Sequence, residues 1–366
     1  MKVLTITGTR PELIKLSLVI KKLDSIKDVD HIFIYTNQNY DVNLRDIFLK
    51  DLELRSPDYT FTETGFKSFL PNAFMQFDMI LDKEKPDKVL VLGDTNSGLL
   101  AILANKRGIP VYHMEGGLRS WDNRVPEESN RRIIDTISRY NLPHTENSKQ
   151  NLIKEGYHKN NVFKIGNPIY EVLTWYDKEI KKSRILHDMG LMLHDWPGIY
   201  DPPIDYILIT FHRADNVDNV ERSLNVVRAV NKIAENIPVI LSFHPRAKDQ
   251  LTKHNIKFHD NVKLCESIGF FDFVMLEKNA KCVISDSGTV PEECAIFHKP
   301  CIAIRAFTER QELVENGSLI LCGTDTEDIL RAYNVACKMS TDWDDIPDYM
   351  KLNVSDTVVK ILTGKT

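Results

Sequence analysis

Short apolar runs rich in Val and Ile recur along the chain, and each is followed by a polar turn and then by residues with helical spacing. The first series lies at 3–7, 32–36, 89–92, 111–114 and 162–165. A second series lies at 206–211, 239–243, 262–265, 282–285, 301–304 and 319–321. Continuous apolar runs that alternate with helices are typical of parallel strands buried on both faces of a sheet. The pattern therefore predicts an α/β fold with two Rossmann-like, doubly wound domains.

The domain boundary is expected between the two series of runs. The chain has 366 residues, whereas a single hydrophobic core stops growing near about 250–300 residues. A loop rich in Pro and Gly before residue 206 suits a boundary. Ligands of open α/β sheets bind outside the carboxyl ends of the strands, so we expect the site in a cleft that the two domains face. The expected parts are a first domain over 1–168, a linker helix and loop over 169–205, a second domain over 206–350 and a C-terminal helix over 351–366.

Composition and charge exclude several classes of protein. The chain carries 47 basic and 52 acidic residues, a net charge of −5, which gives no indication of a nucleic-acid partner. No apolar run approaches the roughly 18 residues of a membrane span, and the first apolar stretch is too short for a signal peptide. The six cysteines all lie in the second half and form no C-x-x-C pair. We therefore expect reduced thiols, no metal site and a cytoplasmic protein.

The turn after the first run has the sequence G-T-R-P-E at residues 8–12. Proline suits the first turn of a helix because its missing N–H is not needed there. We expect this turn to aim backbone amides, Arg10 and, one helical turn later, Lys15 at the cleft as an anion site. The alternative is a plain strand-to-helix turn with solvated charges.

Three acidic residues stand at or near the ends of successive predicted strands: Asp94, Glu115 and Glu127. Carboxylates gathered at one sheet edge suit general acid–base chemistry. Two of them also have simpler explanations. Asp94 is a good N-cap for the next helix, and Glu127 lies four residues before Arg131, the spacing of a surface ion pair.

The second half carries features that suit a nucleotide. His212 ends the first run of the second series, where it can titrate or donate a hydrogen bond in the cleft. Ser287 and Gly288 lie in a small-residue turn before a helix with Pro in its first turn, which predicts backbone amides that cradle a phosphate. Glu293 is placed to accept hydrogen bonds from ribose hydroxyls, and Arg310 adds a cation. A nucleoside diphosphate sugar fits this set.

Taken together, the motifs resemble the non-hydrolysing UDP-N-acetylglucosamine 2-epimerase family. The resemblance runs from G-T-R-P-E at 8–12 through G-D-T, H-x-E-x-G, P-E-E-x-N-R, H-R and S-D-S-G to T-E-R at 308–310. It implies a fold like that of the glycosyltransferase-B enzymes, with the C-terminal helix packing back on the first domain. It also implies a homodimer formed through the first domain.

The resemblance assigns roles to individual residues. It implies a catalytic set of Asp94, Glu115, Glu127 and His212, with the histidine near the leaving diphosphate. It implies a substrate-binding set in which Phe273 packs beside uracil. That second set consists of Arg10, Lys15, Arg131, Phe273, Ser287, Gly288, Glu293 and Arg310.

The implied reaction inverts C2 of a UDP-2-acetamido sugar, from UDP-N-acetylglucosamine to UDP-N-acetylmannosamine. Direct loss of the C2 proton is costly because no carbonyl is adjacent, so UDP is eliminated across C1–C2 and then added back. This chemistry needs no nicotinamide and no metal. Features at Thr289 and 39–41 look more like the capsule branch, whose members act on UDP-2-acetamido-2,6-dideoxy-hexoses in UDP-N-acetylfucosamine synthesis. The same fold also occurs in UDP-sugar glycosyltransferases and could serve a UDP-sugar-binding protein without chemistry.

Overall fold

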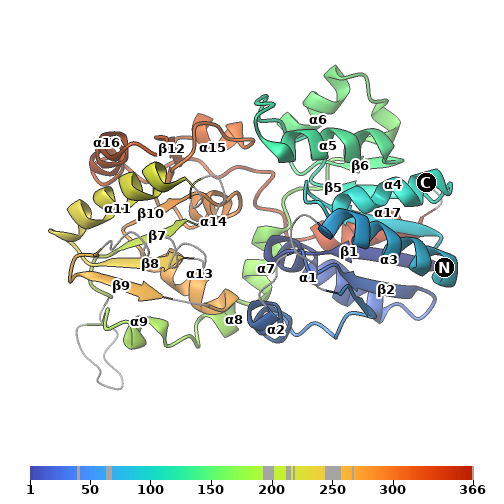
Figure 1. Cartoon of the computed structure of the whole chain (residues 1–366), viewed down its shortest axis with the longest axis horizontal. Coiled ribbons are helices and arrows are strands. Elements are labelled where there is room, and N and C mark those ends of the chain that lie inside the picture. The colour runs from blue at the N-terminus through green and yellow to red at the C-terminus, as the bar shows by residue number, and fades with distance from the viewer. Residues whose placement is uncertain are drawn as a thin grey trace. The chain divides into compact units, whose positions relative to one another are not determined.

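The computed structural model describes residues 1–38, 42–62, 68–192, 202–211, 216, 219–243, 257–265 and 268–364. The chain forms two compact units, drawn in Figure 1. Unit 1 consists of Met1–Thr174 together with Pro347–Thr366, and unit 2 consists of Trp175–Ile346. The division falls at Thr174, inside the stretch that the sequence analysis assigned to a linker.

Unit 1 is built on a sheet of six parallel strands in the order β3-β2-β1-β4-β5-β6. This is the Rossmann strand order, and the direction of winding reverses between β1 and β4. Residues that follow these two strands therefore line the crevice where such sheets bind ligands. The strands are β1 (Lys2–Thr7), β2 (Asp30–Tyr35), β3 (Tyr59–Thr60), β4 (Lys88–Leu92), β5 (Val111–Met114) and β6 (Tyr140–Leu142).

Helices cover the sheet of unit 1, and α17 lies against α1 although it comes from the far end of the chain. Lys22 donates a 2.7 Å hydrogen bond to Asp356, and the backbone N–H of Ser355 donates one of 2.8 Å to Glu171. These contacts attach the C-terminal helix to unit 1. The helices of this unit are α1 (Arg10–Ser25), α2 (Val42–Asp51), α3 (Phe69–Glu84), α4 (Ala101–Lys106), α5 (Pro126–Ile137), α6 (Glu146–Lys154), α7 (Ile169–Trp175) and α17 (Val354–Thr363).

Unit 2 repeats the same topology, with six parallel strands in the order β12-β11-β10-β7-β8-β9. Winding reverses here between β7 and β10. The strands are β7 (Ile207–Phe211), β8 (Val239–Phe243), β9 (Val262–Cys265), β10 (Cys282–Ser285), β11 (Cys301–Ala303) and β12 (Leu319–Leu321). The helices are α8 (Asp177–Ile180), α9 (Ile185–Asp188), α11 (Val220–Ala234), α13 (Phe270–Asn279), α14 (Val290–Ile296), α15 (Gln311–Glu315) and α16 (Thr326–Ala336).

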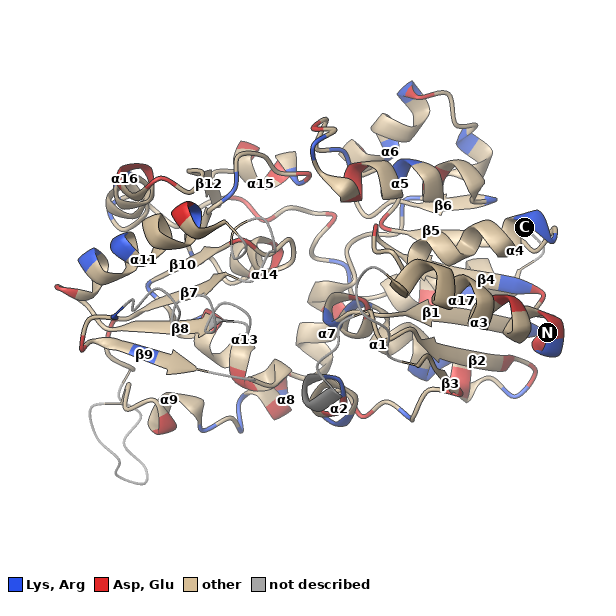
Figure 2. Cartoon of the chain, in the orientation of Figure 1, with Lys and Arg blue, Asp and Glu red and all other residues tan. Residues whose placement is uncertain are grey.

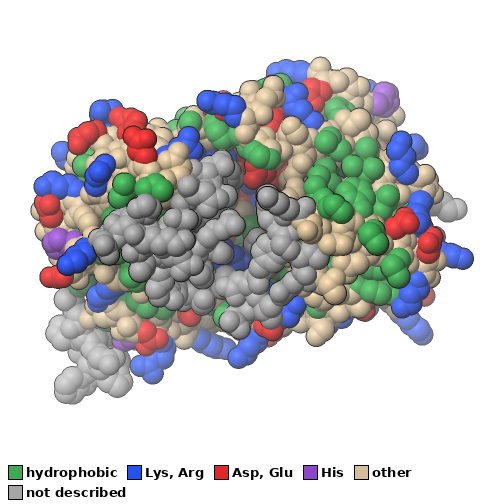
Figure 3. Space-filling view, in the orientation of Figure 1, with side chains coloured by type: hydrophobic (Ala, Val, Ile, Leu, Met, Phe, Trp, Pro, Cys, Tyr) green, Lys and Arg blue, Asp and Glu red, His purple; other side chains and the backbone are tan. Residues whose placement is uncertain are grey.

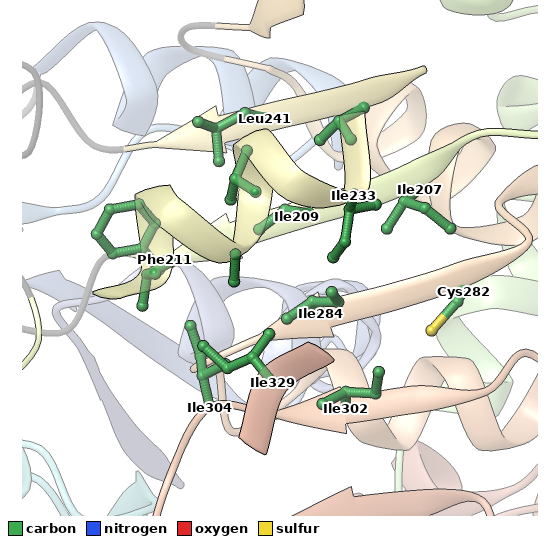
Figure 4. Packing of buried hydrophobic residues seen from close by; sticks show 14 of the residues in the cluster. Ile207, Ile209, Phe211, Ile233, Leu241, Cys282, Ile284, Ile302, Ile304 and Ile329 are labelled. Carbon is green, nitrogen blue, oxygen red and sulfur yellow. The ribbon is translucent and has the colours of Figure 1, made fainter. Parts of the chain in front are cut away.

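The core of unit 2 explains why its strands are apolar without alternation. Ile209 and Ile284 point to the face where Ile233 of α11 and Ile329 of α16 pack, as Figure 4 shows. The side chains that alternate with them along the same strands, such as Leu208 next to Ile209, point to the opposite face and are equally buried. Both faces therefore need apolar residues, and each buried Ile or Leu contributes about 1.5–3 kcal/mol. The predicted fold class, two doubly wound α/β domains, is confirmed.

None of the helices in the described part of the chain has the length and apolar character needed to cross a membrane.

Candidate active site

In unit 1, the turn after β1 differs from the predicted anion site. The backbone N–H groups of Gly8 and Thr9 donate to Oε2 of Glu12, at 2.8 and 2.7 Å, and the Thr9 hydroxyl donates to the same oxygen at 2.8 Å. Thr95, in the turn after β4, donates to Oε1 of Glu12 at 2.7 Å. Glu12 stands at the third helical position, from which a carboxylate reaches back to the helix start. These amides therefore bind the chain's own carboxylate, and the role of Arg10 and Lys15 at an anion site stays a prediction.

The Glu12 carboxyl is buried among these donors. Burial raises the pKa of Glu12 to about 7, against the hydrogen bonds from Thr95 and Thr9, which lower it. Glu12 thereby joins the turns after β1 and β4, the two strands at the switch point. Arg10 in the same turn lies with its guanidinium 5.9 Å from the centre of the Phe48 ring, while its backbone begins α1.

Lys15 and Glu115 meet beside this turn. The Lys15 ammonium donates a 2.7 Å hydrogen bond to Oε1 of Glu115, and the two side chains are only 1% and 8% exposed. Glu115 has φ +67°, a left-handed backbone conformation that is costly for a residue with a side chain and is often found at functional sites. Gly93, also left-handed at φ +73°, lies so close that a methyl group there would be 3.2 Å from Oε2 of Glu115. The structure thus brings together a predicted cation and a predicted base.

Arg131 of α5 holds Asp94, another of the three predicted acids of this edge. Its Nη2 and Nε both donate to Oδ2 of Asp94, and its Nη1 donates to Glu128 at 2.6 Å. Asn130 donates to the backbone carbonyl of Asp94 at 3.0 Å. Asp94 is therefore held through its side chain and its backbone by α5, which carries both acidic and basic positions in Figure 2. Glu127 lies in the first turn of the same helix and is half-buried.

A buried network that the sequence analysis did not assign supports these acids. His113 contacts Asp135 through Nδ1 and the carbonyl of Gly93 through Nε2, both at 2.8 Å. Arg119 lies 2.8 Å from the other oxygen of Asp135. The network links β5, which Glu115 follows, to the turn that carries Asp94. The available indication in the sequence was a histidine two residues before Glu115.

In unit 2, the turn after β10 is closed by its own hydroxyl groups. The N–H of Ser287 donates to the Ser285 hydroxyl at 2.9 Å, and the N–H of Thr289 donates to the Ser287 hydroxyl at 3.2 Å. Two of the amides expected to cradle a phosphate are thus used within the turn, and the phosphate-binding role of Ser287 and Gly288 stays a prediction. Short hydroxyl side chains compete for backbone amides in this way.

Arg310 lies beside Gly288 and is held by acids. Its Nε donates to Glu292 and its Nη1 to Glu309. Arg305 donates to the second oxygen of Glu309 at 2.9 Å. These four charges cancel, so the predicted cationic clamp is a charge-balanced cluster in which Arg310 is fixed in orientation. A methyl group at Gly288 would lie 3.3 Å from Nη1 of Arg310, so glycine permits this approach.

The other predicted residues of unit 2 lie on α13 and α14. Phe273 is partly exposed on α13. Glu293 is buried in the first turn of α14 and lies beside Glu277 of α13, a residue that the sequence analysis did not select. His212 lies outside the described residues, as do residues 39–41. Within the described ranges, no three His, Cys, Asp or Glu side chains are grouped so as to hold a metal ion.

Comparison with known proteins gives matches along nearly the whole chain. A family model described as UDP-N-acetylglucosamine 2-epimerase matches residues 21–363. A UDP-N-acetylglucosamine 2-epimerase of Methanocaldococcus jannaschii is 37% identical, over 99% of this chain and 99% of the relative. A UDP-2,3-diacetamido-2,3-dideoxy-D-glucuronate 2-epimerase of Pseudomonas aeruginosa is 33% identical, over 91% of each chain. The crystal structure of Methanocaldococcus jannaschii UDP-GlcNAc 2-epimerase in complex with UDP-GlcNAc and UDP is similar with a TM-score of 0.90, at 38% identity and over 99% of both chains.

Proposed function

The chain belongs to the UDP-N-acetylglucosamine 2-epimerase family, and on that premise we propose that it inverts C2 of a UDP-2-acetamido sugar without net hydrolysis, converting UDP-N-acetylglucosamine to UDP-N-acetylmannosamine. The observation that carries the proposal is the buried pair of Lys15 and Glu115 at the edge of the first sheet, beside Asp94 and Arg131. Carboxylates at this edge, each fixed by a cation, suit proton transfer at a single carbon.

The reaction proceeds by elimination and re-addition. A carboxylate removes the C2 proton while the C1–O bond breaks, and the bonding electrons leave with UDP. The remaining sugar has a C1–C2 double bond. A protonated acid then returns a proton to the opposite face of C2, and the diphosphate oxygen adds back at C1. Asp94, Glu115 and Glu127 are the proposed acids and bases of these two proton transfers.

The residues of unit 2 are proposed to hold UDP. Arg310, kept in place by Glu292 and Glu309, meets the charge that develops on the leaving diphosphate. Glu293 accepts hydrogen bonds from the ribose, and Phe273 packs beside the uracil ring. His212 is proposed to assist the leaving diphosphate. The sugar binds at unit 1, where Arg10, Lys15 and Arg131 stand near the acids.

One experiment tests the reaction. The protein is incubated with UDP-N-acetylglucosamine in deuterated water, and the sugar is followed by NMR. Deuterium at C2 together with the C2 epimer is the expected result. The test is repeated with a UDP-2-acetamido-2,6-dideoxy-hexose, because the threonine at position 289 is a feature in which this chain resembles the capsule branch of the family. Exchange with that sugar alone would move the proposal to the capsule substrate, and no exchange with either would refute it.

We also propose a homodimer located in the cytoplasm. Met75 and Met79 of α3 are 67% and 71% exposed, and Figure 3 shows hydrophobic side chains gathered on the face of unit 1 turned to the viewer. Exposed apolar patches often mark protein interfaces. Light scattering should give twice the 42.1 kDa chain mass, and the double change of Met75 and Met79 to Glu should give the monomer. Six free cysteines suit a reducing compartment.

A further inference from the structure

A second carboxyl group lies behind the one proposed to bind ribose. Glu277 of α13 is completely buried, and its carboxyl lies beside that of Glu293 on α14, which is 4% exposed. No amide, hydroxyl or cation among the described residues donates to either oxygen of Glu277. A buried acid with an acid as its partner calls for a physical explanation, because buried carboxylates are normally paired with cations or donors.

The two carboxyls share a proton. Two negative charges in contact and out of water cannot both persist, so one acid of such a pair keeps its proton. The neighbouring ionisable groups that raise the pKa of Glu277 are Glu293 and Cys301 of β11. Glu277 in turn raises the pKa of Cys294 of α14 and of Tyr206. All of these are acids or thiols, and none is a cation. Burial and the neighbouring Glu293 raise the pKa of Glu277 well above its usual range, which assigns the proton to Glu277.

The position of Glu277 on α13 relates this acid to the proposed nucleotide site. Phe273 and Glu277 are four residues apart on one helix, so they lie on the same face. Phe273 is partly exposed while Glu277 is completely buried. One helix face therefore carries the residue proposed to pack on uracil and the residue that contacts the proposed ribose acceptor.

We propose that Glu277 is a positioning residue for nucleotide binding, whose buried carboxylic acid donates a hydrogen bond to Glu293 and fixes that carboxylate for the ribose hydroxyls of UDP. The inference rests on the proposed function, since it takes Glu293 as the ribose acceptor. The pair carries one negative charge in this state. Loss of the Glu277 proton at alkaline pH adds a second charge, removes the donor and weakens UDP binding.

The test measures UDP binding by calorimetry on the full chain, from about pH 6.5 to about pH 9. Glu277→Met removes the donor, and the Kd for UDP should rise about tenfold or more. Glu277→Gln keeps an N–H donor and should restore the Kd to within about threefold of the unmodified protein. The unmodified protein should bind more weakly at the alkaline end, and Glu277→Gln should lack this additional weakening. Lys278→Met, an exposed position on the same helix, is the control.

The outcomes separate this inference from the proposed function. A folded Glu277→Met variant with an unchanged Kd, or a Glu277→Gln variant with the full alkaline weakening, overturns the role of Glu277 alone. If Glu277→Met does not fold, the pH profile of Glu277→Gln decides. If the unmodified protein does not bind UDP, or binds it equally well after Glu293→Gln, the proposed nucleotide site itself is wrong. In turnover assays, Glu277→Met should raise KM for the UDP-sugar and leave kcat within about twofold, because Glu277 acts on binding.

Discussion

Lys15 and Glu115 form a buried ion pair in unit 1, with Nζ of the lysine 2.7 Å from Oε1 of the glutamate. The lysine comes from α1 and the glutamate from the end of β5, so the pair joins two elements on either side of the switch point. A charged donor of this kind fixes the direction of the carboxylate, which suits a base. The left-handed backbone at Glu115 adds strain that the surrounding contacts must hold.

Lys15→Met should therefore lower both stability and activity. Removing one partner of a buried pair leaves an uncompensated charge and costs about 3–5 kcal/mol. Chemical unfolding should show this loss, and kcat should fall by about a hundredfold or more because the Glu115 carboxylate loses its fixed partner. Lys21→Met is the matched control, since Lys21 of the same helix pairs with the exposed Glu53, and it should cost less than about 1 kcal/mol. Equal losses in the two variants would contradict the special role of Lys15.

Arg131→Lys should lower kcat by about tenfold or more while KM changes little. A lysine keeps the charge but cannot bond to Asp94 and Glu128 at once in the planar geometry of the guanidinium. Steady-state kinetics on UDP-N-acetylglucosamine measure the effect. Arg132→Lys is the control, because Arg132 also pairs with Glu128 yet is 41% exposed. Full turnover in Arg131→Lys would show that Asp94 needs no such orientation.

Gly8→Ala should destabilise the turn after β1. A methyl group there would lie 2.1 Å from Oγ of Ser97 and 2.3 Å from Oγ1 of Thr36, which are hydrogen-bonded to each other at 2.6 Å. Forcing extra volume into such a site costs about 1–3 kcal/mol. Thermal unfolding should show the loss, whereas Gly364→Ala at the end of α17 should change stability by less than about 0.5 kcal/mol. An unchanged melting temperature in Gly8→Ala would mean that the turn has room to move.

The sequence predicts the sheets well where strands are buried on both faces, and poorly at the edges of the first sheet. The runs at β1, β4, β7 and β10 are mostly apolar because both faces are covered. The short strands Tyr59–Thr60 and Tyr140–Leu142 lack such a run, and the predicted strand at 162–165 contributes only a bridge from Val162 to Asn141. Edge pairing depends on distant partners, which a local pattern does not contain.

The candidate site could likewise be predicted only in part from the sequence. The position of each acid after a strand follows from the order of strands and turns, so the meeting of Lys15 with Glu115 is a consequence of the fold. Which acceptor a backbone amide or a cation selects is decided over fractions of an ångström. The turn at Gly8 therefore binds Glu12 where the sequence analysis expected a ligand. Glu277 was not selected from the sequence, because one glutamate between apolar neighbours does not reveal burial.

Glu12 should make the stability of unit 1 depend on pH. Its pKa is raised to about 7 in the folded chain from an ordinary value of 4.5. The folded state therefore holds this proton more tightly than the unfolded state, so the stabilisation is complete below about pH 4.5 and is lost as the pH rises to about 7. The difference corresponds to roughly 3 kcal/mol. Glu12→Gln cannot ionise and should lack this loss, so the free energy of unfolding of the variant should rise relative to that of the unmodified protein between about pH 5 and about pH 7.5. Denaturant unfolding at both pH values measures the difference, and parallel pH dependence in the two proteins would show that Glu12 is ionised in the fold without cost.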